Sequence, residues 1–413
     1  MLNQLTHWLK EKQFFLLNGL LALLFADVMV DPNNLIFHAK YILFVLVFLV
    51  WLTGRYYTGN KIPVRLGFAV IFIVLFMPFY ALSVGIIRSA LHNVPVGNLV
   101  YFNSFFFFSI ALVTTYDQIN LTRLFNRSSL LIVFLTLGLY AALVFNPHWF
   151  GSLYKYFVLN KGVAVYALRN YGKVTMLMIF YKTSPLLVFP LSYYLYHIIT
   201  DNSKKSPFSY YLLTALIILT LFLSGTRANV LSLFLILIFY LGFFIYRKSR
   251  SWFLLALGLG LLVFLFALPS LWNVIMNRHE ASNAIKFGYL SSYADYFSGH
   301  LLSLIFGQGI GGEFFAYGLQ RFMSASELTY LEVIRIWGIP IAVVFGLVLI
   351  WPLVMEIRAR KLSHLFVAYL AYLFIAGTNP LLLSSTGMLV LVYVFSMEFG
   401  EETSLKAKAQ RKK

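Results

Sequence analysis

The stretch Leu212–Phe239 reads LLTALIILTLFLSGTRANVLSLFLILIF and decides the fold class of the chain. Two apolar runs, over 208–223 and 228–246, are separated only by Ser224-Gly225-Thr226-Arg227. Each run approaches the roughly 20 residues that a helix needs to cross a bilayer. The segment between them is long enough only for a tight turn. The pattern therefore predicts two antiparallel membrane helices joined on one face of the membrane.

The rest of the sequence repeats this pattern. Apolar residues make up 61% of the chain, charged residues 11%, and the mean hydropathy is +0.82, values typical of an integral membrane protein. Long unbroken runs argue against the alternating strands of a porin-like barrel. We expect an all-α, polytopic fold in one membrane domain, 1–413, with about twelve spans. The spans are 13–30, 35–53, 64–87, 98–114, 129–146, 174–200, 208–223, 228–246, 252–272, 333–355, 362–378 and 385–399.

The basic residues predict the orientation of the chain. With the N-terminus inside, most Lys and Arg residues fall in the short inner connections and in the basic tail, 400–413. Both termini are then cytoplasmic, and the tail contacts lipid of the inner leaflet. This bias accounts for the net charge of +18, so no nucleic acid partner is expected.

Two long loops lie on the outer face in this orientation, 147–173 and 273–332, and the second is expected to be partly helical. Cations there oppose the insertion preference of membrane proteins, so we place the function on this face. Charge placement makes five residues candidates for substrate binding: Arg169, Lys182, Arg278, Arg321 and Arg335. Lys182 is expected inside the span 174–200, where prolines permit a kink; a snorkelling lysine is the alternative.

Arg227 is a candidate for anion binding. Gly225 supplies the backbone angles of a tight turn, and Thr226 is expected to cap the following helix. Arg227 then stands in the first helical turn, where the helix dipole makes a cation locally unfavourable. A phosphate between the helix N-terminus and the guanidinium would resolve this conflict. A guanidinium that snorkels at the interface is the alternative, and the sequence leaves both open.

The large outer loop contains the glycine-rich segment FGQGIGGEFFAYG, residues 306–318. Its spacing fits neither a Walker A motif nor a dinucleotide fingerprint, so a flexible turn close to the membrane is favoured. Farther along, Glu327 and Arg335, at i and i+8, are expected on one helical face. Glu332 and Arg335, at i and i+3, favour an intrahelical ion pair. Glu327 is either a capping carboxylate or a general base.

No metal site is expected from the sequence. The outer histidines lack the spacing of metal ligands, and the chain has no cysteine. Asp27 and Asp31, at i and i+4, could share a divalent ion. Asp31 precedes Pro32, however, and is better explained as a turn residue.

Four segments occur in a characteristic order along the second half of the chain. They are SGTRA at 224–228, FGQGIGG at 306–312, E-x-x-Y-L-E-x-x-x-x-x-G-I at 327–339 and NPLLLSSTGM at 379–388. Their order, spacing and outer placement together resemble the bacterial O-antigen polymerase and O-antigen ligase superfamily.

The resemblance implies a GT-C-like glycosyltransferase that needs no metal or other cofactor and uses polyprenyl-diphosphate-linked sugars. Arg227 would bind the donor diphosphate and Glu327 would act on the acceptor hydroxyl, with Tyr330 of the same motif as a further substrate-binding candidate. Ligases of the superfamily typically carry histidine at the position of Glu327. The glutamate therefore favours a polymerase of undecaprenyl-diphosphate-linked repeat units.

The implied setting is the bacterial inner membrane, with the active face in the periplasm. Donor and acceptor are both lipid-linked glycans, and a chain-length regulator is an expected protein partner. An O-antigen ligase that transfers polysaccharide to lipid A core is the closest alternative. A flippase for lipid-linked sugars is the alternative from another class, although such transporters often show two related halves and this sequence does not.

Overall fold

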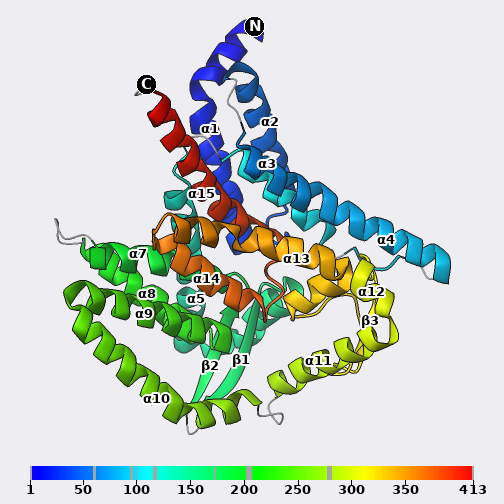
Figure 1. The fold of residues 1–413 in the computed structure, drawn as a ribbon, viewed down its shortest axis with the longest axis vertical. Helices are drawn as coiled ribbons and strands as arrows, with labels where there is room; N and C mark the ends of the chain where they lie inside the picture. Colours follow the sequence, from blue (N-terminus) through cyan, green and yellow to red (C-terminus); the bar gives the residue numbers. More distant parts are fainter. Residues whose placement is uncertain are drawn as a thin grey trace.

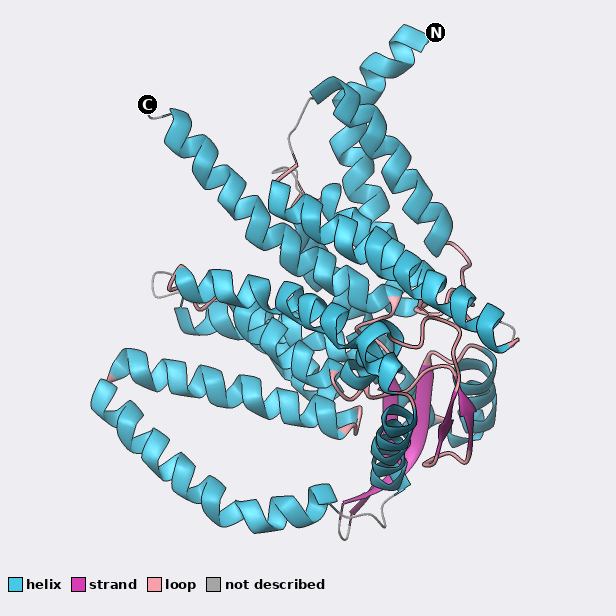
Figure 2. Ribbon diagram, turned by 45° about the vertical axis from the view of Figure 1, so that its right-hand side comes forward, coloured by secondary structure: helices cyan, strands magenta, loops and turns pink. Residues whose placement is uncertain are grey.

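The computed structural model describes residues 2–58, 62–93, 96–99, 101–114, 119–171, 174–200, 207–276 and 281–411. These residues form a predominantly helical membrane protein with two β-hairpins. The N- and C-termini lie at the same end of the molecule (Figure 1). The hairpins lie toward the opposite end, which we call the hairpin end (Figure 2).

The longer helices carry most of the chain. They are α1 (Leu2–Val30), α2 (Lys40–Thr58), α4 (Met77–His92), α5 (Leu121–Phe145), α8 (Phe208–Leu223), α9 (Arg227–Lys248), α10 (Arg250–Met276), α11 (Ala281–Gly299), α13 (Thr329–Arg358) and α15 (Ser385–Arg411). Shorter α-helices are α3 (Val64–Val70), α6 (Phe150–Leu153), α7 (Val188–Thr200), α12 (Leu301–Phe306) and α14 (His364–Ala376). The 3-10 and π segments are η1 (Ile71–Phe76), η2 (Phe102–Leu112), η3 (Pro147–Trp149), η4 (Tyr154–Asn160) and η5 (Ser184–Leu187).

Five helical segments among the described residues are long and apolar enough to cross a membrane. They are Lys12–Val30, Val64–His92, Leu121–Phe145, Arg227–Lys248 and Thr329–Arg358. Other expected spans form shorter apolar helices, such as Phe208–Leu223 and His364–Ala376. The prediction of a mainly α-helical membrane protein is confirmed, whereas the number of about twelve complete spans stays a prediction.

The first third of the expected span 174–200 is a β-strand, so that prediction is wrong there. Strands β1 (Ala164–Tyr171) and β2 (Val174–Tyr181) form an antiparallel hairpin. The sequence of β2, VTMLMIFY, is rich in β-branched and aromatic residues, which favour strands. Helix begins only at η5, where Pro185 is tolerated in the first turn. Lys182 consequently lies in the turn after β2 rather than inside a helical span.

The loop 273–332 is partly helical, as predicted, since it contains all of α11 and α12. It also contains an unpredicted hairpin of β3 (Phe314–Ala316) and β4 (Arg321–Met323). Helix α11 packs beside β3 (Figure 1), and Tyr293 stacks on Phe314 with ring centroids 5.1 Å apart. This small aromatic core is separate from the main core of the helical bundle.

The glycine-rich segment is buried from Gly307 to Gly312, so the prediction of a flexible turn is wrong. It runs between α4 and α13, and its amides donate to both helices. Gln308 N donates to Arg335 O at 2.6 Å, and Ile310 N donates to Ala81 O at 2.8 Å. Glycine is required because the backbones approach closely: a Cβ at Gly309 would lie 2.3 Å from Gly85 N. The segment is thus a packing element.

Helix α13 is interrupted at Gly338, whose φ of 78° and ψ of 165° are not helical. We expect Gly338→Ala to lower the thermal stability of the detergent-solubilised protein, by about 1–3 kcal/mol for the strained backbone alone. A Cβ there would also lie 2.2 Å from Ile305 O. Gly346→Ala in the same helix is the matched control, because a Cβ at Gly346 meets no atom within 4 Å. Equal melting temperatures for the two variants would contradict this account.

Candidate functional site

The turn between α8 and α9 has the tight geometry that the sequence predicts. Gly225 has a φ of +62°, and a Cβ on it would lie 2.5 Å from Met178 Cγ of β2. The expected cap by Thr226 is wrong, since no side chain caps the start of α9. Thr226 Oγ1 is instead buried without a hydrogen-bond partner among the residues that the structure describes. The β-hairpin thus packs directly against the turn that presents Arg227.

A small network of side-chain hydrogen bonds holds the turn between α8 and α9 in place. The buried Asn229 side chain donates from Nδ2 to Ser224 Oγ at 3.0 Å and to Ser184 Oγ at 2.9 Å. These bonds tie the first turn of α9 to the residue that opens η5, just after the hairpin. Asn229 was not singled out from the sequence, although a buried asparagine within an apolar run is a signal that could have found it.

Arg227 is the first residue of α9 and is half-buried. Its Nη1 donates to Oδ1 of Asn283, at 2.7 Å, and Asn283 is itself only 7% exposed. The amide oxygen is a neutral acceptor, and this bond sets the direction in which the guanidinium lies. The structure therefore holds a cation in a set position at the positive end of a helix dipole, which is the geometry that favours a bound anion.

Glu327 is exposed in the connection between β4 and α13. The helix begins at Thr329, so the predicted helical face shared by Glu327 and Arg335 is wrong. The capping alternative is not realised either, because no side chain caps α13 and only the backbone oxygen of Glu327 accepts from Thr329 N, at 3.1 Å. Among the described residues its carboxylate has no hydrogen bond or ion pair. It is available to a substrate.

Helix α11 connects the surroundings of Arg227 and Glu327. Asn283 contacts Arg227 near the start of this helix. Six residues later, burial raises the pKa of Tyr289, and the negative charge of Glu327 raises it further. Six residues advance a helix by about 9 Å and rotate it to a face about a third of a turn away. One short stretch of α11 thus contacts Arg227 through Asn283 and lies within electrostatic range of Glu327 at Tyr289.

Glu332 and Arg335 form the ion pair that their spacing predicts. Arg335 Nε donates to Glu332 Oε2 at 2.9 Å, and Nη2 donates to Oε1 at 2.6 Å, with exposed fractions of 1% and 0% for the two residues. The remaining donors go to Gln308 Oε1, to Gly312 O at 3.0 Å and to Ser324 O at 2.8 Å.

All five guanidinium N–H groups of Arg335 are therefore used within the protein. None is left for a substrate phosphate, so the prediction of Arg335 as a substrate-binding residue is corrected to a structural role. Tyr293 supports the same carboxylate, because its hydroxyl donates to Glu332 Oε2 at 2.7 Å. The ion pair Glu332–Arg335 holds the glycine-rich segment against α13 through the bonds of Arg335 to Gln308 and Gly312.

The other described substrate-binding candidates, Arg321, Tyr330 and Lys182, belong to different elements of the fold. Arg321 is exposed at the start of β4. The Tyr330 hydroxyl donates to Leu373 O of α14 at 2.6 Å, which anchors it to the bundle. Burial lowers the pKa of Lys182. Arg169 belongs to β1, but its side chain lies outside the described residues, as does Arg278 entirely.

The carboxylate of Asp31, directly after α1, is used within the protein. Asp31 is a turn residue, as favoured, because its carboxylate accepts from Leu35 N at 2.8 Å, Ile36 N at 2.6 Å and Phe37 N at 2.9 Å. Within the described parts of the chain, no group of three or more His, Cys, Asp and Glu side chains could hold a metal ion.

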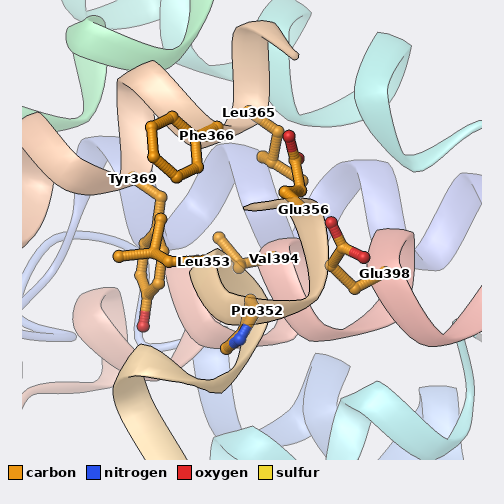
Figure 3. Close-up of a pocket in the computed structure, with 8 residues that line it drawn as sticks. All are labelled: Pro352, Leu353, Glu356, Leu365, Phe366, Tyr369, Val394 and Glu398. Carbon is orange, nitrogen blue, oxygen red and sulfur yellow. The ribbon is translucent and has the colours of Figure 1, made fainter. Parts of the chain in front are cut away.

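A second pair of carboxylates lies at the far end of α13 from Glu327. Glu356 and Glu398 border a crevice between α13, α14 and α15 (Figure 3). Glu356 accepts from Ser363 N at 3.0 Å and from Ser363 Oγ at 2.5 Å, and Ser363 in turn caps α14. Glu356 therefore has a structural explanation as the support of a helix start.

Comparison of the chain with known protein families, with curated proteins and with solved structures gives no match.

Proposed function

We propose that the chain is a glycosyltransferase that joins polyprenyl-diphosphate-linked oligosaccharide repeat units into a surface polysaccharide. The observation that carries the proposal is the pairing of an oriented arginine with an accessible carboxylate beside one helix. Arg227 stands at the head of α9, where Asn283 orients it, and the carboxylate of Glu327 is exposed near Tyr289. A cation and a base are the two groups that this transfer needs.

The chemistry follows from the donor. The acceptor hydroxyl oxygen attacks C1 of the donor sugar, the bond between C1 and the phosphate oxygen breaks, and the lipid diphosphate leaves with the electron pair. Arg227 binds this diphosphate and stabilises the charge that builds on it. Glu327 takes the proton from the acceptor hydroxyl. The diphosphate linkage is already activated, so the reaction consumes no nucleotide.

Transport of a lipid-linked sugar is the second candidate, because the break in α13 at Gly338 is of the kind that transporters use. In a transporter such a break lines a substrate cavity. Here the glycine-rich segment fills it: a Cβ at Gly338 would meet Ile305 O and Gly307 N. Trp337 Nε1 also donates to Met77 O at 2.8 Å. This packing favours the transferase.

The proposal is tested with purified protein and a synthetic lipid-diphosphate repeat unit as both donor and acceptor. A ladder of products that grows by one repeat unit is the expected result. A single transfer to lipid A core, with no ladder, would instead identify a ligase. Movement of the repeat unit across a vesicle membrane without any new glycosidic bond would identify a flippase and overturn the proposal.

Arg227→Ala is expected to weaken binding of the lipid-diphosphate donor by about tenfold to a hundredfold, since a charge-assisted hydrogen bond contributes about 1.5–3 kcal/mol. Arg227→Lys keeps the charge but loses the fork of donors, so we expect intermediate binding. The measurement is a titration of purified protein with the donor. Donor affinity in Arg227→Ala equal to that of the wild type would exclude a diphosphate site here.

A further inference from the structure

Arg88, near the end of α4, is a half-buried arginine with no hydrogen bond or ion pair to the described residues. Its Nε is buried and has no hydrogen bond, and its guanidinium makes no hydrogen bond or ion pair with any residue that the structure describes. Arginine stays charged in proteins, so burying it without a partner is unfavourable. Arg335, by contrast, uses all five of its donors within the protein. The positive charge of Arg335 is also close enough to repel that of Arg88.

Arg88 is surrounded by a glycine, an exposed acid and a tyrosine. A Cβ at Gly312 would lie 2.5 Å from Arg88 Nη1, so the guanidinium lies directly against the backbone of the glycine-rich segment. Glu313 is the nearby acid that attracts Arg88 electrostatically, but its side chain is exposed and forms no ion pair with it among the described residues. Tyr296 of α11 also interacts electrostatically with Arg88.

The position of Arg88 matters because α11 also reaches Arg227 and Glu327. Asn283, Tyr289 and Tyr296 follow one another along this helix: Asn283 contacts Arg227, while Tyr289 and Tyr296 interact electrostatically with Glu327 and Arg88 respectively. Asn283 and Tyr296 are separated by about 20 Å along the helix axis, and Tyr289 lies near the middle of this stretch. Helix α11 is thus common to the surroundings of both arginines and of the exposed carboxylate.

We infer that Arg88 forms a second anion-binding site, which takes the diphosphate of the lipid-linked acceptor while Arg227 takes that of the donor. This inference rests on the proposed function, in which both substrates carry a diphosphate. A guanidinium binds phosphate oxygens with two parallel hydrogen bonds, and a phosphate here would supply the acceptors that Arg88 lacks.

The test is a calorimetric titration of the purified full chain with farnesyl diphosphate, which carries the shared lipid-diphosphate chemistry. Wild-type protein is expected to bind two equivalents, and Arg88→Gln and Arg227→Gln one each. Arg123→Gln is the matched control, since Arg123 is exposed at the start of α5, and should keep both equivalents.

A parallel titration with inorganic diphosphate distinguishes the lipid-linked ligand from the free anion. Binding of the free anion as tightly as farnesyl diphosphate at the Arg88 site would overturn the assignment to a lipid-linked acceptor.

The outcomes separate the two proposals. If Arg88→Gln keeps two equivalents while Arg227→Gln loses one, the inference about Arg88 is overturned and the donor site stands. If only Arg88→Gln loses an equivalent, the Arg88 site stands and the donor site of the proposed function fails. The melting temperature of Arg88→Gln should equal that of the wild type, because Arg88 has no hydrogen bond or ion pair to lose within the described part of the chain. A clear fall would show a structural role and overturn the inference.

Discussion

Glu327→Gln is expected to lower the rate of polymerisation by about 10²–10⁴-fold, the usual contribution of general-base catalysis. The amide keeps the shape of the side chain but cannot accept the proton of the acceptor hydroxyl. Because the carboxylate is exposed and has no partner among the described residues, its loss should leave the fold intact. The measurement is the initial rate of ladder growth with a saturating lipid-linked repeat unit.

Two further variants make the result for Glu327 specific. Glu327→Asp keeps a carboxylate one methylene farther from the substrate, so we expect a rate between those of the wild type and Glu327→Gln. Asp295→Asn removes an exposed carboxylate from α11 and should polymerise at the wild-type rate. A wild-type rate in Glu327→Gln would remove Glu327 from the mechanism, whatever the donor titrations show.

The sequence predicts the membrane helices well where apolar runs are long and end at clear signals. Helix α9 begins at Arg227, directly after the Ser-Gly-Thr turn, as the hydropathy and the glycine together indicate. The same logic fails at 174–181, because a short apolar run fits a strand and a helix equally well. The enrichment in β-branched and aromatic residues was the signal that could have decided between them.

The chemistry of the site could be predicted from the sequence only in part. The pair Glu332–Arg335 follows from local spacing, and the structure contains it. The role of the glycine-rich segment depends on Gly85 and Ile336, which lie far away in the sequence. The same holds for Arg88: its charge is visible in the sequence, but its lack of a partner is a property of the packed structure.

Arg335→Met is expected to destabilise the protein by about 3–5 kcal/mol, the usual cost of removing one partner of a buried ion pair. Methionine fills much of the volume, so the effect comes from charge and hydrogen bonds rather than from a cavity. Glu332 would remain buried at 0% exposure without its counter-ion. Gly312 O and Ser324 O would lose their donor as well. The measurement is thermal or denaturant unfolding in detergent.

The double variant Glu332→Gln with Arg335→Met separates charge from hydrogen bonding. Once the carboxylate is neutral, no uncompensated charge is buried, so the double variant should be more stable than Arg335→Met alone. Recovery should be incomplete, because the carbonyl oxygens of the glycine-rich segment and of Ser324 still lack a donor. Arg321→Met is the matched control: Arg321 is exposed on β4, so the same change should alter stability by less than about 0.5 kcal/mol. An Arg335→Met variant as stable as Arg321→Met would show that the buried pair does not hold the glycine-rich segment in place.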